Sequence, residues 1–156
     1  MTAPRLAALA LALLAAGCSP RRIPGTEIPA TDDTTAIAAV VERYQAAAEA
    51  RDAAGVLALV SPLYFDDAGT PDPADDLDFE RLSRVLPADL ARVSGVRMSL
   101  KLSDIKVNGD KAQVFVSYDA RYRVTTRSGE VARAQQDVSR LALSREKGTW
   151  KIVSGL

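Results

Sequence analysis

The stretch GVRMSLKLSDIKVNGDKAQVFVSYDARYRV, residues 95–124, decides the fold class. Apolar and polar residues alternate along it, as they do in β-strands with one buried face, and Asn108-Gly109-Asp110 predicts a tight hairpin turn. The apolar alternation slips by one position at Ser103-Asp104. We expect a β-bulge there, because the apolar side chains would otherwise turn toward water. The stretch therefore predicts two long antiparallel strands.

Two further strands are expected downstream of this hairpin. Turn signals at Ser128-Gly129 and Lys147-Gly148 separate a third long strand from a last one that ends at Leu156. Leu141 and Leu143 are the clearest core residues of the third strand. Counting back from them by twos places Asp137 and other polar residues on the side of the core, unless a second bulge intervenes.

Upstream of the hairpin, the apolar period changes to that of helices. A first helix is expected from Thr31 or Asp32, and a second over residues 53–60, capped by Asp52. A third should follow Phe79, kinked or divided by Pro87. Residues 63–65 are a possible short strand. Three helices followed by a four-stranded antiparallel meander predict an α+β fold.

Composition limits the function. The chain has 156 residues, 20 Lys plus Arg and 20 Asp plus Glu, so one domain is expected and no bulk charge favours nucleic acid. With no His, Ser-His-Asp triads and His-dependent dehydratase or cyclase chemistry are excluded. No cofactor or metal is expected.

The N-terminus predicts export. Arg5 precedes an eleven-residue run of Leu and Ala, residues 6–16, too short for a hydrocarbon core of about 30 Å. The following Gly17-Cys18 resembles the lipobox of bacterial lipoproteins. That resemblance implies a signal peptide over residues 1–17, lipidation of Cys18, and anchoring in the cell envelope. In the sorting pattern of such lipoproteins, the residue after the Cys helps to determine the membrane. Ser19 at that position, in place of Asp, resembles the pattern of outer-membrane lipoproteins and implies a protein that faces the periplasm. Residues 18–30, rich in Pro, are expected to form a tether.

The order of elements over residues 31–156 resembles the NTF2-like superfamily, which includes SnoaL-like and ketosteroid-isomerase-like proteins. Three motifs carry the resemblance: the helix ending in Arg51-Asp52, the Val60-Ser61-Pro62 turn, and the closing Gly148-Thr149-Trp150-Lys151-Ile152. It implies a cone in which a curved sheet wraps the first helix and leaves a pocket at its wide end. The superfamily contains isomerases, dehydratases and binding modules, so the fold alone assigns no activity.

Four residues are predicted to bind a small, mostly apolar ligand in that pocket: Tyr44, Tyr64, Tyr118 and Asp137. Burial would supply affinity, and the hydroxyl and carboxyl groups would orient the ligand. Asp137 has a structural alternative, an ion pair with Arg121, Arg133 or Arg140. The residues Asp72, Asp75, Asp76 and Asp78 are better explained as a solvated loop than as a Ca²⁺ site.

The main functional hypothesis is a lipid-anchored, non-catalytic ligand-binding or scaffolding module, with no catalytic residue assigned. One alternative is a cofactor-free isomerase or hydratase that uses an Asp base, for which Asp66, Asp67 and Asp137 are candidates. The other is an interaction module that binds an envelope protein or a second copy of itself through the sheet face. Arg121, Arg123 and Arg127 form a basic strip on that face.

Overall fold

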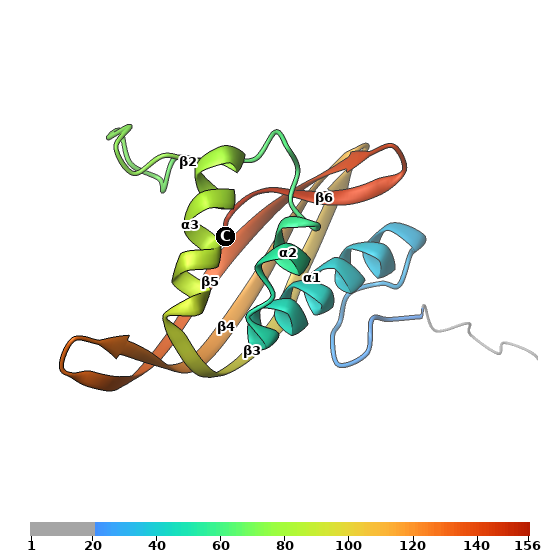
Figure 1. The fold of residues 1–156 in the computed structure, drawn as a ribbon. Coiled ribbons are helices and arrows are strands. Elements are labelled where there is room, and N and C mark those ends of the chain that lie inside the picture. The colour runs from blue at the N-terminus through green and yellow to red at the C-terminus, as the bar shows by residue number, and fades with distance from the viewer. Residues whose placement is uncertain (1–20) are drawn as a thin grey trace, which may run out of the picture.

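The computed structural model describes residues 21–156, so the predicted signal peptide and Cys18 lie outside the described residues. Three helices pack against one face of a curved four-stranded sheet, which confirms the α+β class (Figure 1). A two-stranded ribbon, β1 with β2, precedes α3. The elements are α1 (Asp32–Ala50), α2 (Ala53–Leu57), β1 (Phe65–Asp66), β2 (Leu77–Asp78), α3 (Phe79–Ala91), β3 (Val93–Asn108), β4 (Lys111–Thr126), β5 (Gly129–Glu146) and β6 (Thr149–Ser154).

Helix α1 begins where the sequence predicts. The Thr31 hydroxyl accepts a hydrogen bond from the Thr34 backbone N–H at 3.1 Å, and the Thr34 hydroxyl accepts one from the Thr31 N–H at 2.9 Å. This reciprocal capping satisfies two N–H groups that the first turn leaves free. Asp32 and Asp33 add negative charge beside the positive end of the helix dipole.

The four long strands pair in the order β3-β4-β5-β6, each antiparallel to the next. The register of β3 against β4 shifts between Leu102 and Asp104, which confirms the predicted bulge. A second shift lies between Ser94 and Arg97. Strands β4 and β5 pair without interruption from Lys111 to Thr126, so the alternation of faces carries through the whole of β5.

Strand β6 covers only part of the edge of β5. It pairs with residues 142–146, so within the described chain no strand pairs with the other edge of β5 over residues 129–141. The outer edge of β6 is closed by the segment after α2. The Ser61 N–H donates to the Ile152 carbonyl at 2.8 Å, and the Ile152 N–H donates to the Leu59 carbonyl at 2.9 Å.

The free edge of β3 is closed by side chains of α1. The Gln45 amide donates to the Met98 carbonyl at 2.7 Å and accepts from the Leu100 N–H at 3.2 Å. The Glu49 carboxylate accepts from the Met98 N–H at 2.8 Å. A sheet edge needs such partners because unpaired backbone groups otherwise invite pairing with another chain.

The sheet has two ends of different character. At the closed end, Ile37 of α1 packs with Leu143, Trp150 and Ile152, all almost fully buried. Arg145 adds a polar clamp there. Its guanidinium lies 2.7 Å from an Asp33 oxygen and 4.7 Å from the centre of the Trp150 ring. The open end, around Tyr118 and Asp137, contains the cavity described below.

The predicted tether is folded wherever it is described. Ile23 and Ile28 are buried in the main hydrophobic cluster, only 6% and 5% exposed. The Ile23 N–H donates to the Ile28 carbonyl at 2.9 Å, and the Ala30 N–H donates to the Arg21 carbonyl at 2.6 Å. Residues 21–30 therefore form a turn packed on the domain. The free energy gained by burying two Ile side chains outweighs the conformational entropy that the segment loses when it is ordered.

Two helices also differ from expectation. Helix α2 ends at Leu57 instead of continuing to Val60, although Asp52 caps it as predicted, accepting from the Gly55 N–H at 2.9 Å. Helix α3 runs through Pro87 without division. No helix within residues 21–156 is long and apolar enough to span a membrane.

Candidate functional site

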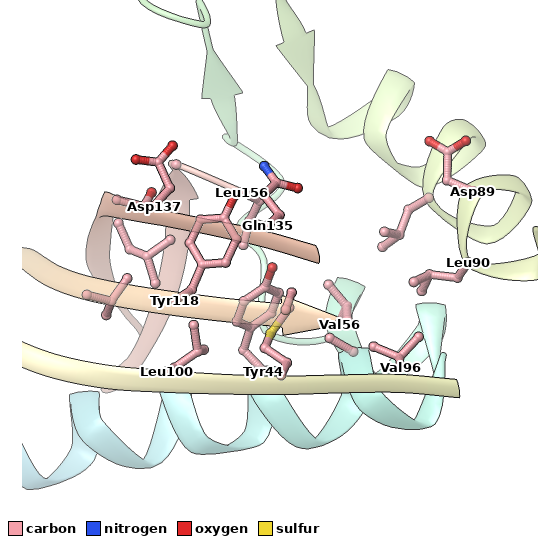
Figure 2. A pocket seen from close by; sticks show the side chains of 18 of the residues that line it. Tyr44, Val56, Asp89, Leu90, Val96, Leu100, Tyr118, Gln135, Asp137 and Leu156 are labelled. Carbon is pink, nitrogen blue, oxygen red and sulfur yellow. The ribbon is translucent and has the colours of Figure 1, made fainter. Parts of the chain in front are cut away.

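A cavity of about 730 Å³ lies between α3 and the open end of the sheet (Figure 2). Its apolar wall comes from three elements. Helix α3 contributes the face that its heptad-like apolar spacing predicts, β3 contributes alternate residues, and α2 contributes one side chain. The main residues of this wall are Leu82, Val85, Leu86, Leu90, Val96, Met98, Leu100 and Val56.

The polar side of the cavity comes from α1, β4 and β5. Tyr118 lies directly opposite Asp137 in the register, and Ala120 lies directly opposite Gln135. Residues opposite each other in an antiparallel pair point to the same face, so all four line the cavity. Tyr44 reaches it from the last turns of α1. Figure 2 shows Tyr44 and Tyr118 on one side and Leu90 of α3 on the other.

Both tyrosines have a pKa above the ordinary value of 10.0, so both are neutral at neutral pH. Burial raises the pKa of Tyr44, and the neighbouring Tyr118 raises it further. Burial also raises the pKa of Tyr118, with smaller contributions from the Asp137 carboxylate and Tyr122, while a hydrogen bond with Gln135 acts in the opposite direction. A neutral phenol keeps its O–H, so each can donate a hydrogen bond to a ligand.

Tyr64, although predicted as a ligand-binding residue, does not line the cavity. It is buried, and its hydroxyl accepts from the Leu156 N–H at 3.2 Å while lying 3.5 Å from an Asp66 oxygen. Burial, chiefly, raises the pKa of Tyr64 to about 12. Asp66 does line the cavity, but its carboxylate also accepts from the Gly155 N–H at 2.5 Å and the Ala68 N–H at 2.9 Å. These two residues hold the C-terminus in place.

Asp137 faces the cavity as predicted, since no second bulge interrupts β5. It is exposed instead of buried, because β6 does not cover this part of β5. The structural alternative is wrong, because within residues 21–156 no salt bridge joins Asp137 to an arginine. One carboxylate oxygen accepts from the Val138 N–H at 2.7 Å.

The other candidate residues lie away from the cavity. Asp67 is exposed and accepts from the Gly69 N–H at 3.0 Å. Asp78 caps α3, and Asp75 accepts from the Thr70 hydroxyl at 2.8 Å. No group of three or more metal-ligating side chains is found in the described part of the chain. Arg121 lies on the opposite face of the sheet, where its guanidinium is 3.6 Å from Asp119.

Sequence reasoning missed several lining residues. Tyr122 and Gln135 share the face of Tyr118 by the period of two, so the strand pattern already contained their signal. Met98 lies on the apolar face of the predicted strand, and the apolar residues of α3 lie on one face of the helix, positions that are typical of core. They line the cavity because the helix covers the open end without filling it.

An α+β cone with an open cavity at its wide end is the architecture of NTF2-like proteins, and comparison with solved structures supports this class. A conserved protein from Planctomyces limnophilus has a TM-score of 0.65 at 17% identity, covering 80% of this chain and 98% of that one. A ketosteroid isomerase-like protein from Erwinia carotovora atroseptica has a TM-score of 0.64 at 16% identity, covering 80% and 93%.

A protein from Streptomyces avermitilis, described as a dehydratase of the NTF2-like family, has a TM-score of 0.61 at 21% identity, covering 80% of this chain and 95% of that one. The model of the SnoaL-like domain matches residues 37–155. The chain therefore belongs to the SnoaL-like domain family, within the NTF2-like superfamily. A comparison with curated proteins finds no significant match.

Proposed function

We propose that the protein is a non-catalytic binding module for a small, mostly apolar molecule. The observation that carries this proposal is the cavity of about 730 Å³, whose size and mixed lining are typical of small-molecule sites. The apolar body of the ligand would contact Leu86 and Leu90 of α3. Its polar end would face Tyr118 and Gln135, whose positions are fixed by the pairing of β4 with β5.

The proposal includes the place of the protein in the cell. Lipidation of Cys18 would anchor the module in the bacterial envelope, on the periplasmic face of the outer membrane. Support comes from the sequence alone, through the apolar run of residues 6–16 and the lipobox-like residues that follow it. Globomycin treatment of expressing cells, followed by mass spectrometry of the protein, tests this part by detecting the uncleaved diacylated precursor.

Binding is tested by filling the cavity. Ala120 lies on the cavity side of β4 and Ala134 on the opposite side of β5. We expect Ala120→Phe to weaken the binding of Nile red, a neutral apolar dye, while Ala134→Phe leaves it unchanged. Dye fluorescence measures affinity, and urea unfolding verifies that both variants fold. Equal binding by the two variants would contradict the proposal.

The second candidate function is a cofactor-free isomerase or hydratase. The observation that favours it is that Tyr118 and Asp137 occupy directly opposite positions and both line the cavity. A carboxylate base beside a phenol donor is the arrangement that proton transfer next to a carbonyl requires. Asp137 is exposed, however, so nothing in its surroundings excludes water from the base.

Deuterium exchange separates the two functions. If the protein is an enzyme, a cyclic ketone in heavy water should gain deuterium next to its carbonyl faster than in a blank, and Asp137→Asn should abolish the gain. If the protein only binds, the rate should equal that of the blank for both proteins. NMR spectroscopy of the ketone measures this rate.

A further inference from the structure

The charge of the cavity selects among the apolar molecules that would fit it. Of the residues within 21–156 that line it, three are Asp and none is Lys or Arg. The three are Asp66, Asp89 and Asp137. Asp66 is partly buried, whereas Asp89 and Asp137 are exposed, so these carboxylates act on a ligand chiefly by making the potential at the cavity negative. An anionic ligand would meet repulsion, and no lining residue within residues 21–156 is a cation that could offset it.

The three carboxylates differ in their partners. Asp66 accepts hydrogen bonds from the Gly155 and Ala68 N–H groups. Asp89 lies 3.7 Å from the Arg92 guanidinium. Asp137 accepts a hydrogen bond from the Val138 N–H, and no salt bridge within residues 21–156 joins it to a cation. Arg133 lies on the same face of β5, four residues from Asp137, a distance of about 13 Å along the strand. It does not line the cavity.

The surroundings of Asp137 suit an organic cation. Tyr118 is its direct neighbour across the strands, and Tyr44 lies beside Tyr118 (Figure 2). The face of an aromatic ring is electron-rich and attracts an ammonium group, and both Tyr44 and Tyr118 line the cavity. Apolar side chains of α3 and β3 line the opposite wall. A carboxylate with aromatic rings at one side and an apolar wall at the other matches a molecule with one amine and an apolar body.

We propose that the cavity binds lipophilic amines, with the protonated amine beside Asp137 and Tyr118 and the apolar body against α3. This inference rests on the proposed binding function and names its ligand class. The preference for cations comes from the absence of basic residues among those that line the cavity within residues 21–156. Asp137 supplies the charge, and the tyrosine rings supply the contact with the ammonium group.

Three probes with the same body test the charge preference: adamantylamine, adamantanol and adamantane carboxylate. Calorimetric titration of the purified full chain at neutral pH measures each affinity against a protein-free blank. We expect the amine to bind roughly tenfold more tightly than the alcohol, and the carboxylate to bind least. Added salt should lower the affinity for adamantylamine and leave the affinity for adamantanol unchanged, because screening acts only on the charged probe.

Two variants locate the effect. Asp137→Asn should reduce the affinity for adamantylamine roughly tenfold and leave that for adamantanol unchanged. Asp119→Asn is the matched control, because it removes the same charge one residue away from Tyr118 on the opposite face of the sheet. We expect this control to bind both probes as the parent does. An equal loss in the two variants would overturn the assignment to Asp137.

The outcomes separate this inference from the proposed function. Binding of adamantanol with an affinity equal to or above that of the amine overturns the cation preference and leaves the binding function standing. Failure of all three probes and of Nile red overturns the binding function, and the ligand class with it.

Discussion

Strands β4 and β5 run through both the closed end and the open end of the sheet, but their surroundings differ at the two ends. At the closed end, β5 pairs with β6 on its edge, Arg145 of β5 forms an ion pair with Asp33 of α1, and Leu143 is 1% exposed. At the open end, β4 is the only strand within residues 21–156 that pairs with β5, and Asp137 is exposed. The length of β6 therefore divides the sheet into a part that supports the fold and a part that is free to bind.

The largest expected effect tests this division with one substitution made at each end. Leu143→Ala should lower the free energy of unfolding by about 3 kcal/mol, since it leaves a cavity in a closely packed region. Leu86→Ala, on the half-buried wall of the existing cavity, should cost about 1 kcal/mol or less. Urea unfolding measures both, and equal losses would mean that the two ends are packed alike.

The second prediction concerns the polar clamp of the closed end. Arg145→Met should cost about 1 to 2 kcal/mol, because Asp33 loses its partner and the Trp150 ring loses a cation. Arg121→Met, which breaks an exposed pair with Asp119 on the other face, should cost under about 0.5 kcal/mol. Thermal unfolding of the two variants compares them, and a larger loss for Arg121→Met would contradict the assignment.

The third prediction concerns how stability depends on pH through the buried Tyr64. The folded pKa of Tyr64 is about 12 and its ordinary value is 10.0. Unfolding therefore makes the phenol easier to ionise, so its contribution to stability is complete below pH 10 and is lost as the pH rises toward 12. Tyr64→Phe should reduce this alkaline loss of stability. Unfolding followed from pH 9 to 12 measures it, and identical slopes in the two proteins would refute the role of Tyr64.

The smallest effect is expected at the open end. Tyr118→Phe removes a hydroxyl that faces the cavity, so the free energy of unfolding should stay within about 0.5 kcal/mol of the parent value. The same variant should bind adamantanol more weakly if the hydroxyl orients the polar end of a ligand. A large loss of stability would place Tyr118 among the structural residues instead.

The fold could be predicted from sequence because each rule involved is local. Alternation with a period of two defined β3 and β4, and its slip located the bulge near Ser103 before any partner strand was known. Thr31 and Asp52 cap helices for reasons contained within three residues of each. The faces of β5 followed from counting back from Leu143, which placed Asp137 correctly.

The burial of the site residues could not be predicted, since it depends on contacts with residues distant in the sequence. Alternation gave the side toward which Asp137 points, but its exposure depends on where β6 stops. Tyr64 follows the turn at Ser61, and only the path of the C-terminus shows that its hydroxyl contacts Leu156 instead of a ligand. Ile23 is buried together with Ile28 in the main hydrophobic cluster. The prolines of this segment indicated an extended chain, so its packing on the domain was not predicted.

The packed turn at residues 21–30 has a consequence for how a membrane-bound form would be oriented. Only Ser19 and Pro20 separate Cys18 from Arg21, and a link of that length spans roughly 10 Å when extended. The proposed lipid on Cys18 would thus keep the domain a short distance from the bilayer. Residues 21–30 pack beside the first turns of α1, while Tyr44 and Ala48 of its later turns line the cavity. The cavity would then lie at the end of α1 away from the lipid, where it could exchange its ligand with the aqueous compartment.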